Sequence, residues 1–299
     1  MHSAGENMTN SFFVKKRSAY KRYVRSKFVT FIIALFLILA GLFTILPLIY
    51  SISTSFKPLE ELLKFPPAFF VSRPTFQNYL QLPSIISSLS VPLSRYIFNS
   101  LFISIVTTAG HVIIAAMAAF AMSKGRYKGL AVVFLIVQFS LLYNSYTLAV
   151  PQYIIMSKLQ LVDTFWVYIL PYLPSSLGVF LIKQYMDGSI PDALLEAAYI
   201  DGAGEFKMFW QIVMPNSKPA WMTLIMFAFR DLWSLQPQGT IFTEELKLLP
   251  NVMSTIVSGG IARSGSAMAA MVLLMIPPLL VYLVSQSSIV ETMTTSGIK

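Results

Sequence analysis

The chain contains no cysteine and only two histidines, His2 and His111. The absence of cysteine excludes a disulfide framework, a thiolate metal site and a cysteine nucleophile. The two histidines lie too far apart in the sequence to form a local metal motif. The sequence also lacks a G-x-x-x-x-G-K-[ST] phosphate-binding loop. We therefore expect no metal site, no bound ATP and no catalytic site in this chain.

Charge is scarce as well, whereas hydrophobic residues are abundant. Charged residues make up 12% of the 299 positions and hydrophobic residues 56%, while soluble domains carry about 25% charged residues. The net charge of +9 would suit a nucleic-acid-binding protein, but seven of the 22 basic residues precede the first long apolar run. Such a cluster is typical of a cytoplasmic segment held against anionic lipid headgroups. We expect membrane lipid as a partner and no nucleic acid.

Six apolar segments have about the 20 residues that a helix needs to cross a bilayer. The first is longer than the roughly 7–15 apolar residues of a signal-peptide core and precedes no small-residue cleavage site, so we expect it to remain a membrane helix. The sequence thus predicts an all-α, polytopic membrane protein with a basic N-terminal segment at 1–28, a six-helix transmembrane domain at 29–285 and a tail at 286–299. The six predicted spans are residues 29–49, 97–122, 130–150, 165–185, 220–235 and 267–285.

The distribution of lysine and arginine predicts the orientation of these spans. If the N-terminus lies inside, the inner segments hold fourteen basic residues and the outer segments eight. The contrast is sharpest in the short loop after the second span, which carries Lys124, Arg126 and Lys128. Both termini and the segment 187–218 are therefore predicted to face the cytoplasm.

The segment 187–218 is polar and helix-prone in an otherwise apolar chain. Pro191 suits the start of a helix, and Asp192 complements the positive end of the helix dipole. Gly202 supplies the backbone freedom for a turn. A second helix is expected from residue 205, where four apolar side chains recur with helical spacing: Phe206, Phe209, Trp210 and Val213. The segment therefore predicts a helix-turn-helix whose second helix packs against the membrane bundle.

This segment resembles the EAA loop of bacterial ABC importer permeases. That pattern is Glu-Ala-Ala, three residues, Gly, nine residues, Ile, one residue and Leu-Pro; the chain matches every spacing, with Met214 where Leu is usual. An ordinary cytoplasmic connection between two membrane helices is the alternative. The resemblance implies docking into a cleft of an ATPase subunit by Glu196, Ala197, Ala198, Asp201, Gly202, Ala203, Ile212 and Pro215.

The resemblance covers more of the chain. Residues 180–233, the Phe-Lys-Pro after the first span and the Asn99-Ser100 pair look like the second permease subunit of maltose-type oligosaccharide importers. It implies half of a membrane channel in the bacterial plasma membrane, paired with a homologous permease. It also implies two ATPase subunits, which bind ATP and Mg, and an extracellular solute-binding protein that delivers a carbohydrate. In the maltose-type subunit, the loop that corresponds to about residues 236–265 of this sequence reaches into the binding protein. The tail of that subunit reaches between the ATPase subunits. For the tail of this chain, a flexible end is the alternative.

Polar side chains inside the spans are candidates for a solute path, because polar groups are costly in a bilayer. The end of the third span is rich in aromatic, amide and hydroxyl groups, which suit a sugar, although an interfacial aromatic belt with interhelical hydrogen bonds is an alternative. Arg230 and Asp231 lie about 100° apart on the fifth span, so we expect that they do not simply neutralise each other. The candidate path residues are Tyr143, Asn144, Tyr146, Gln152, Arg230 and Asp231.

Two other functions are compatible with the sequence. The same architecture imports amino acids, peptides or other small solutes, and no residue names the solute or shows whether its pocket lies in this subunit. A secondary transporter working without ATP would need paired carboxylates or histidines in its spans, and only Asp231 and His111 come close. The sequence favours a non-enzymatic permease subunit of a carbohydrate importer.

Overall fold

The computed structural model describes residues 27–87, 91–125, 127–143, 145–236, 239–257, 260 and 263–296. All regular secondary structure in these ranges is helical, in agreement with the predicted all-α class. The chain forms two units, residues 1–49 and residues 50–299. The expected basic segment lies, before residue 27, outside the described residues.

The first unit contains most of α1, a helix of 29 residues over Lys27–Ser55. At 1.5 Å per residue α1 is about 44 Å long, which exceeds the roughly 30 Å of a bilayer's hydrocarbon core. Its most apolar stretch contains no buried residue. A helix that is apolar on all sides suits lipid or another membrane subunit. The segment 29–49 is thus a helix, as predicted.

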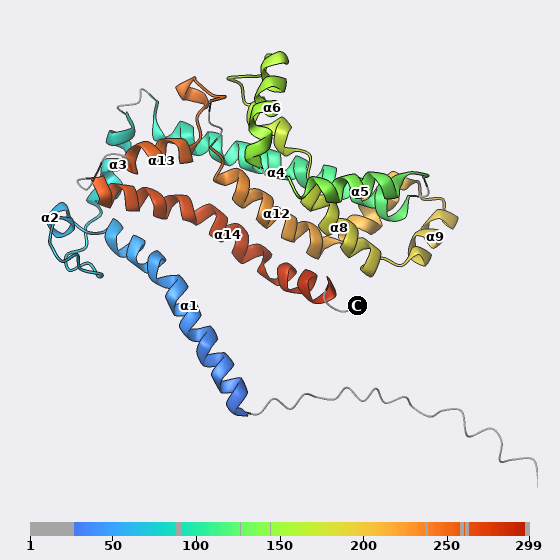
Figure 1. Cartoon of the computed structure of the whole chain (residues 1–299), viewed down its shortest axis with the longest axis horizontal. Coiled ribbons are helices and arrows are strands. Elements are labelled where there is room, and N and C mark those ends of the chain that lie inside the picture. The colour runs from blue at the N-terminus through green and yellow to red at the C-terminus, as the bar shows by residue number, and fades with distance from the viewer. Residues whose placement is uncertain are drawn as a thin grey trace, which may run out of the picture. The chain divides into compact units, whose positions relative to one another are not determined.

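The second unit begins with the last turns of α1 and contains all the other helices. Most of them are short, and two long ones, α4 and α14, run through the unit (Figure 1). In chain order they are α2 (Leu59–Leu62), α3 (Gln77–Ser87), α4 (Leu93–Lys124), α5 (Leu130–Ser140), α6 (Ser145–Lys158), α7 (Trp166–Ile169), the 3-10 turn η1 (Leu170–Tyr172), α8 (Ser176–Ser189), α9 (Asp192–Ile200), α10 (Glu205–Met208), the π-helical η2 (Phe209–Val213), α11 (Met214–Asn216), α12 (Lys218–Trp233), the 3-10 turn η3 (Glu244–Leu246), α13 (Leu249–Val257) and α14 (Ser264–Ser296).

Helix α4 is the central element of this unit and packs against both α8 and α12, while α12 also packs against α14. Its buried side chains are mostly small or hydroxylated, and such residues let membrane helices approach closely. The α8 residue Gly178 lies against both neighbouring helices, since a Cβ placed there would lie 2.6 Å from Leu224 Cδ2 of α12 and 3.0 Å from Ala115 Cβ of α4. The buried residues of α4 are Tyr96, Asn99, Ser100, Ile103, Ser104, Thr107, Thr108, Val112, Ala115, Ala116 and Ala119.

Three apolar clusters form the core around α4. One cluster joins α3, α13 and the beginning of α14 to the C-terminal end of α12. A second joins the C-terminal half of α4 to α8, η2 and the beginning of α12. The third joins Ile103 of α4 to α7 and to Ile241 and Leu248. Figure 1 shows α9 beyond one end of α4 and α3 and α13 beside the other end.

Four of the six predicted spans, residues 29–49, 97–122, 165–185 and 267–285, fall in long apolar helical segments, and the fourth is interrupted at residues 173–175 between η1 and α8. Four helical segments are long and apolar enough to cross a membrane: Lys27–Ser55, Leu93–Lys124, Trp166–Ser189 and Ser264–Ile289. The predicted third span, 130–150, was wrong as a single helix, because α5 ends at Ser140 and α6 begins at Ser145. The fifth lies in α12, whose 16 residues span only about 24 Å. Helix α14 continues through Ser296, so the expected tail is helical up to that residue.

The break in the third segment has a local cause. The amides of Leu141, Leu142 and Tyr143 each bond to the carbonyl three residues earlier, so the last turn of α5 tightens and ends. Serine and asparagine, which follow, compete for backbone hydrogen bonds and favour turns over helix interiors. The apolar length of residues 130–150 alone does not predict this break between α5 and α6.

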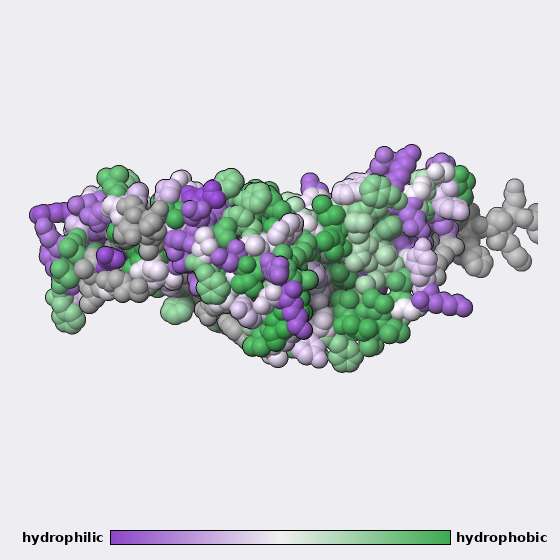
Figure 2. All heavy atoms as spheres, turned by 90° about the horizontal axis from the view of Figure 1, so that it is seen from above, coloured by the Kyte–Doolittle hydropathy of each residue, from purple (hydrophilic) through white to green (hydrophobic). Residues whose placement is uncertain are grey.

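Large hydrophobic side chains also cover much of the molecular surface in Figure 2. On α4 and α5 they include Phe98, Ile105, Val132, Ile136 and Phe139, all of which are exposed. A surface of this kind would be unfavourable in water at about 25 cal/mol per Å². It is the expected surface of a protein that meets lipid or other membrane subunits.

The packing of α8 predicts opposite effects for one substitution at two of its glycines. Gly178→Ala adds a methyl group between α4 and α12, and we expect a loss of about 1–3 kcal/mol of stability from overpacking. Gly188→Ala in the same helix adds a methyl group that meets no atom within 4 Å, so stability should be unchanged or rise by up to about 1 kcal/mol. Thermal melting of the purified protein in detergent measures both, and equal melting temperatures would contradict the proposed contact.

Candidate functional site

The segment 187–218 begins with a short, largely exposed helix. Helix α9 follows the extended residues Ile190 and Pro191. It ends in a Schellman arrangement: Ala203 N donates to Ala198 O at 2.9 Å, and Gly202 N donates to Tyr199 O at 3.0 Å. Gly202 has a φ of +79°, a left-handed conformation that glycine adopts without steric cost. The predicted turn at Gly202 is therefore present.

The residues of the Glu-Ala-Ala pattern divide between the surface and the core. Glu196 and Ala197 are exposed, whereas Ala198 is buried. Asp201, Gly202 and Pro215 are also exposed, and Ala203 and Ile212 are half-buried. Exposed apolar side chains surround them, among them Tyr199 at 74% and Ile200 at 83% exposure. Such a surface can accept another protein, and docking by these residues stays a prediction.

The second half of the segment is a helical stretch of α10, η2 and α11. Phe209 and Val213 are buried in the cluster with α4 and α8, and the Phe209 ring lies 5.8 Å from that of Phe120. Phe206 and Trp210, by contrast, are 70% and 40% exposed. The predicted apolar stripe was therefore wrong for these two residues. Their two rings contact each other on the exposed side, with 6.2 Å between the ring centroids.

The end of α4 holds the connection between α8 and α9. Lys124 Nζ donates to Ile190 O and to Asp192 Oδ1, both at 2.7 Å. The lysine side chain is only 11% exposed. One residue earlier, Ser123 Oγ donates to Asp187 Oδ1, and Lys183 pairs with the other oxygen of the same carboxylate. Thus the position of α9 is fixed by charged groups at the end of α4.

The polar residues after α5 do not form a defined cluster in the described part of the chain. Tyr143 is 66% exposed and Gln152 is half-buried. Asn144 and the side chain of Tyr146 lie outside what the structure describes. Among the described contacts, no hydrogen bond joins Tyr143 or Gln152 to Arg230 or Asp231. The solute path through these residues stays a prediction.

Arg230 and Asp231 correct one expectation. They bond to each other directly: Arg230 Nε and one terminal nitrogen donate to Asp231 Oδ1 at 3.0 and 2.8 Å. Both side chains are more than half exposed, at 62% and 65%. The expectation that a 100° separation prevents pairing was wrong, because long side chains on the last turn of α12 have room to bend together. Exposed pairs of this kind contribute little stability.

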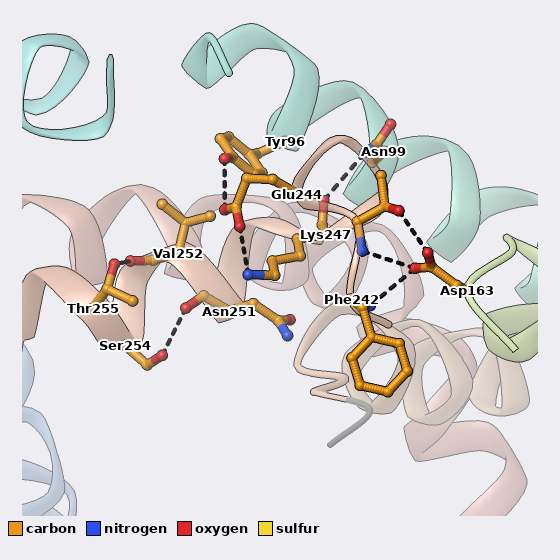
Figure 3. Close-up of polar contacts among 11 residues, drawn as sticks. Tyr96, Asn99, Asp163, Phe242, Glu244, Lys247, Asn251, Val252, Ser254 and Thr255 are labelled. Carbon is orange, nitrogen blue, oxygen red and sulfur yellow. Dashed lines mark hydrogen bonds and ion pairs between the residues drawn. The ribbon is translucent and has the colours of Figure 1, made fainter. Parts of the chain in front are cut away.

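The opposite end of α4 holds a second polar arrangement, part of which is drawn in Figure 3. Asn99 Nδ2 donates to Glu245 O at 2.7 Å and to Lys247 O at 3.1 Å, while Ser100 Oγ accepts from Leu249 N. Tyr96 OH donates to Glu244 Oε1 at 2.9 Å, and Glu244 also pairs with Lys247. These contacts hold the segment of residues 239–248, hereafter the 239–248 loop, against α4. The Asn99-Ser100 pair, noted in the sequence for its family resemblance, thus has a structural task.

Asp163 holds the same loop from another side. Its Oδ1 accepts from Phe242 N at 2.9 Å and Thr243 N at 2.8 Å, and its Oδ2 accepts from Thr243 Oγ1 (Figure 3). These hydrogen bonds, with the Thr243 hydroxyl first, keep the pKa of the Asp163 carboxyl below its ordinary value. Its contribution is therefore complete above the unfolded-state pKa and is lost as pH falls through the lower folded-state pKa. Asp163 could not be predicted as a functional residue, because a lone aspartate before an apolar span has no distinguishing pattern.

A polar cavity of about 260 Å³ opens beside this loop. In the described residues, no group of three metal-ligating side chains lies close enough together to hold a metal ion. The cavity is small for an oligosaccharide and contains no aromatic side chain. It is lined by Gln236, Glu244, Lys247, Asn251, Val252, Ser254 and Thr255.

Comparison with solved structures defines the class of this fold. The chain is similar to a crystal structure of a bacterial ABC transporter involved in the import of the acidic polysaccharide alginate, with a TM-score of 0.72 and 21% sequence identity. The similarity covers 87% of this chain and 96% of the other. The chain therefore shares the fold of a chain of that transporter, and its four long apolar helical segments are those of a multi-pass membrane protein.

Sequence relatives establish the family. The sulfoquinovosyl glycerol transport system permease protein SmoH of Agrobacterium fabrum is 30% identical over 274 residues, which cover 90% of this chain and 93% of SmoH. The galactooligosaccharides transport system permease protein GanQ of Bacillus subtilis is 29% identical and covers 93% of this chain and 97% of its own length. The inner membrane ABC transporter permease protein YcjP of Escherichia coli is 27% identical, covering 89% and 94%.

The chain belongs to the carbohydrate ABC importer permeases. No family model matches it, so membership rests on the full-length relatives. The expected family and the expected role as a transport permease subunit are confirmed.

The contact between α4 and the α8–α9 connection predicts the effect of removing one ammonium group. Lys124→Met removes the ammonium donor from the carbonyl of the buried residue Ile190 and from the carboxylate of Asp192. We expect a loss of about 1–2 kcal/mol of stability, since the ion pair is largely exposed on its aspartate side. Lys128→Met, at an exposed position of the same loop, should change stability by no more than about 0.5 kcal/mol. The melting temperatures of the two variants measure this difference. Similar values would contradict the proposed role of Lys124 in holding the α8–α9 connection.

Proposed function

We propose that this permease forms half of a translocation path together with a homologous permease subunit. In this proposal two ATPase subunits, which bind ATP and Mg, face the segment 187–218, and an extracellular solute-binding protein delivers the solute. Both termini and the segment 187–218 face the cytoplasm of a bacterial cell. Six spans follow if the α5–α6 pair and α12 cross the membrane in addition to the four long segments. The positive-inside distribution supports this orientation.

The observation that carries the proposal is the build of the segment 187–218. Helix α9 presents Glu196 and Ala197 outward, while buried Ala198 and the Schellman turn keep its backbone in one conformation. Phe209 and Val213 fix the following turn to the helical bundle. An exposed helix of small residues on a fixed base suits insertion into a cleft of another protein. It would transmit a displacement, because its base is attached to α4 and α8.

The substrate that we propose is a carbohydrate, most consistently an oligosaccharide. The relatives carry names for transport of galactooligosaccharides, arabinooligosaccharides and sulfoquinovosyl glycerol. Another relative is named for sn-glycerol-3-phosphate, so a smaller solute is the second candidate within the same architecture. Tyr143, Asn144, Tyr146, Gln152, Arg230 and Asp231 are the proposed path residues, since amide, hydroxyl and aromatic groups can bind sugar hydroxyls and ring faces.

The proposed mechanism follows from how α4 is held. Closure of the ATPase subunits would displace α9, and the Lys124 contacts would pass this displacement to the end of α4. Helix α4 is packed along its length against α8 and α12, so these helices would move with it. ATP hydrolysis itself stays in the partner subunits, and this chain contributes the path and the coupling surface.

The test is reconstitution of the permease with its neighbouring permease, ATPase and binding-protein gene products in liposomes. We expect uptake of an oligosaccharide that depends on ATP and on the binding protein. Glu196→Lys should lower both uptake and stimulated ATP hydrolysis at least about tenfold, because a reversed charge at a docked surface is repulsive. Membrane insertion should be unaffected.

Glu60→Lys provides the matched control, since Glu60 is an exposed glutamate in the distant helix α2. It should retain wild-type uptake. Uptake by the wild type without ATP would refute the importer, and unchanged uptake by Glu196→Lys would refute docking through α9. Uptake confined to amino acids or glycerol phosphate would establish the alternative substrates.

A further inference from the structure

The 239–248 loop is held in place by side chains from two separate elements. Three side chains of α4 bind residues 244–247 of the loop and the amide of Leu249 directly after it. Asp163 of the α6–α7 connection binds the loop at residues 240–243. The loop contains no helix apart from the single turn η3. Its conformation therefore depends on these side-chain hydrogen bonds as well as on the burial of Ile241 and Leu248.

Asp163 makes an unusually complete contact with one turn of the loop. Its carboxylate accepts two consecutive amides and the Thr243 hydroxyl, and its own amide donates to Thr240 O at 2.9 Å. Asp163 has a φ of +60° and Gln160 a φ of +55°, a left-handed conformation that aspartate tolerates better than most residues. This backbone geometry turns the carboxylate toward the loop, so the chain adopts an uncommon conformation where the contact forms.

The turn fixed by Asp163 presents one large apolar side chain. Phe242 is 64% exposed, and its ring points away from the polar contacts in Figure 3. On either side of it, Ile241 is buried and Thr243 is bound to Asp163. Because the amide of Phe242 is bound to Asp163, the backbone at this residue is held, and with it the direction of the Cα–Cβ bond that carries the ring. Aromatic side chains are enriched in protein interfaces, so an exposed ring on a fixed turn suits contact with another protein.

The position of the loop identifies its partner. Tyr96 at one end of α4 and Lys124 at the other are separated by about 42 Å of helix, and Lys124 holds the base of α9. If α9 meets the ATPase subunits in the cytoplasm, then Phe242 lies on the outer side of the membrane. The soluble partner proposed for that side is the solute-binding protein.

We infer that Asp163 is a positioning residue for solute delivery: it fixes the 240–243 turn so that Phe242 contacts the solute-binding protein. This inference rests on the proposed function and adds to it the residue that sets the shape of the contact. Asp163 itself touches neither the solute nor the partner.

Two substitutions distinguish the hydrogen bonds that the Asp163 side chain accepts from its negative charge. Asp163→Ala removes all three acceptor bonds to the loop. Asp163→Asn keeps an oxygen for the Phe242 and Thr243 amides and offers an NH₂ group to the Thr243 hydroxyl, which can accept. Rescue by asparagine therefore tests the hydrogen-bond geometry. A general requirement for negative charge would give two equally impaired variants instead.

The experiment measures ATP hydrolysis by the reconstituted complex against the concentration of the binding protein that stimulates the wild type. We expect Asp163→Ala and Phe242→Ala each to raise the half-saturating concentration about tenfold, with maximal and basal rates within about twofold of wild type. Asp163→Asn should stay within about twofold. The double variant Asp163→Ala/Phe242→Ala should resemble Phe242→Ala alone, because Asp163 acts through that ring.

Each other result overturns the inference. A lower maximal rate with an unchanged half-saturating concentration would indicate a role in the transport cycle. Effects of Asp163→Ala and Phe242→Ala that multiply in the double variant would show that the residues act separately. If Asp163→Ala fails to assemble, a wild-type response from Phe242→Ala still refutes the contact. Failure of the wild-type complex to respond to any binding protein would refute the proposed function instead.

Discussion

The close packing of α4 against α8 and α12 is the constraint on which the rest of the larger unit depends. Apolar burial drives helix association weakly where the surroundings are lipid, so tight contact between small residues has to supply much of the attraction. Gly178 and Ala115 provide that contact here, with no space for another methyl group between them. The same helix binds the α8–α9 connection at one end and the 239–248 loop at the other. One well-packed helix thereby sets the position of both surfaces.

These two surfaces are built by different means, in keeping with their proposed tasks. On α9 the backbone is closed by a Schellman turn, and a low surface of small residues is left outside. Its shape comes from the local sequence. The 239–248 loop has little regular structure, and its shape comes from Tyr96, Asn99 and Asp163, which are distant in the sequence. A local motif can be kept through a large displacement, whereas a loop held by several elements changes when those elements separate.

The sequence predicted what depends on local periodicity and missed what depends on distant contacts. The apolar runs at 29–49, 97–122 and 267–285 lie in single long helices, and the turn at Gly202 could be predicted from the glycine alone. The run at 130–150 is divided, because turn-favouring residues outweigh its apolar length. Asp163 could not be found, since its importance lies in amides almost 80 residues away. The Arg230–Asp231 pair was misjudged because a helical wheel describes Cβ directions and ignores the reach of long side chains.

Hydrogen bonds to backbone amides explain how an irregular loop outside a membrane core can keep one conformation. A side-chain hydrogen bond contributes only about 0.5–1.5 kcal/mol net in contact with water, and about 1.5–3 kcal/mol when one partner is charged. Ordering each loop residue costs a comparable amount of conformational entropy. A carboxylate that binds two successive amides and a hydroxyl is therefore an efficient way to fix a short turn. A single aspartate accomplishes this at 240–243, and burial of Ile241 beside it prevents the loop from turning over. The exposed direction of Phe242 follows from these two contacts together.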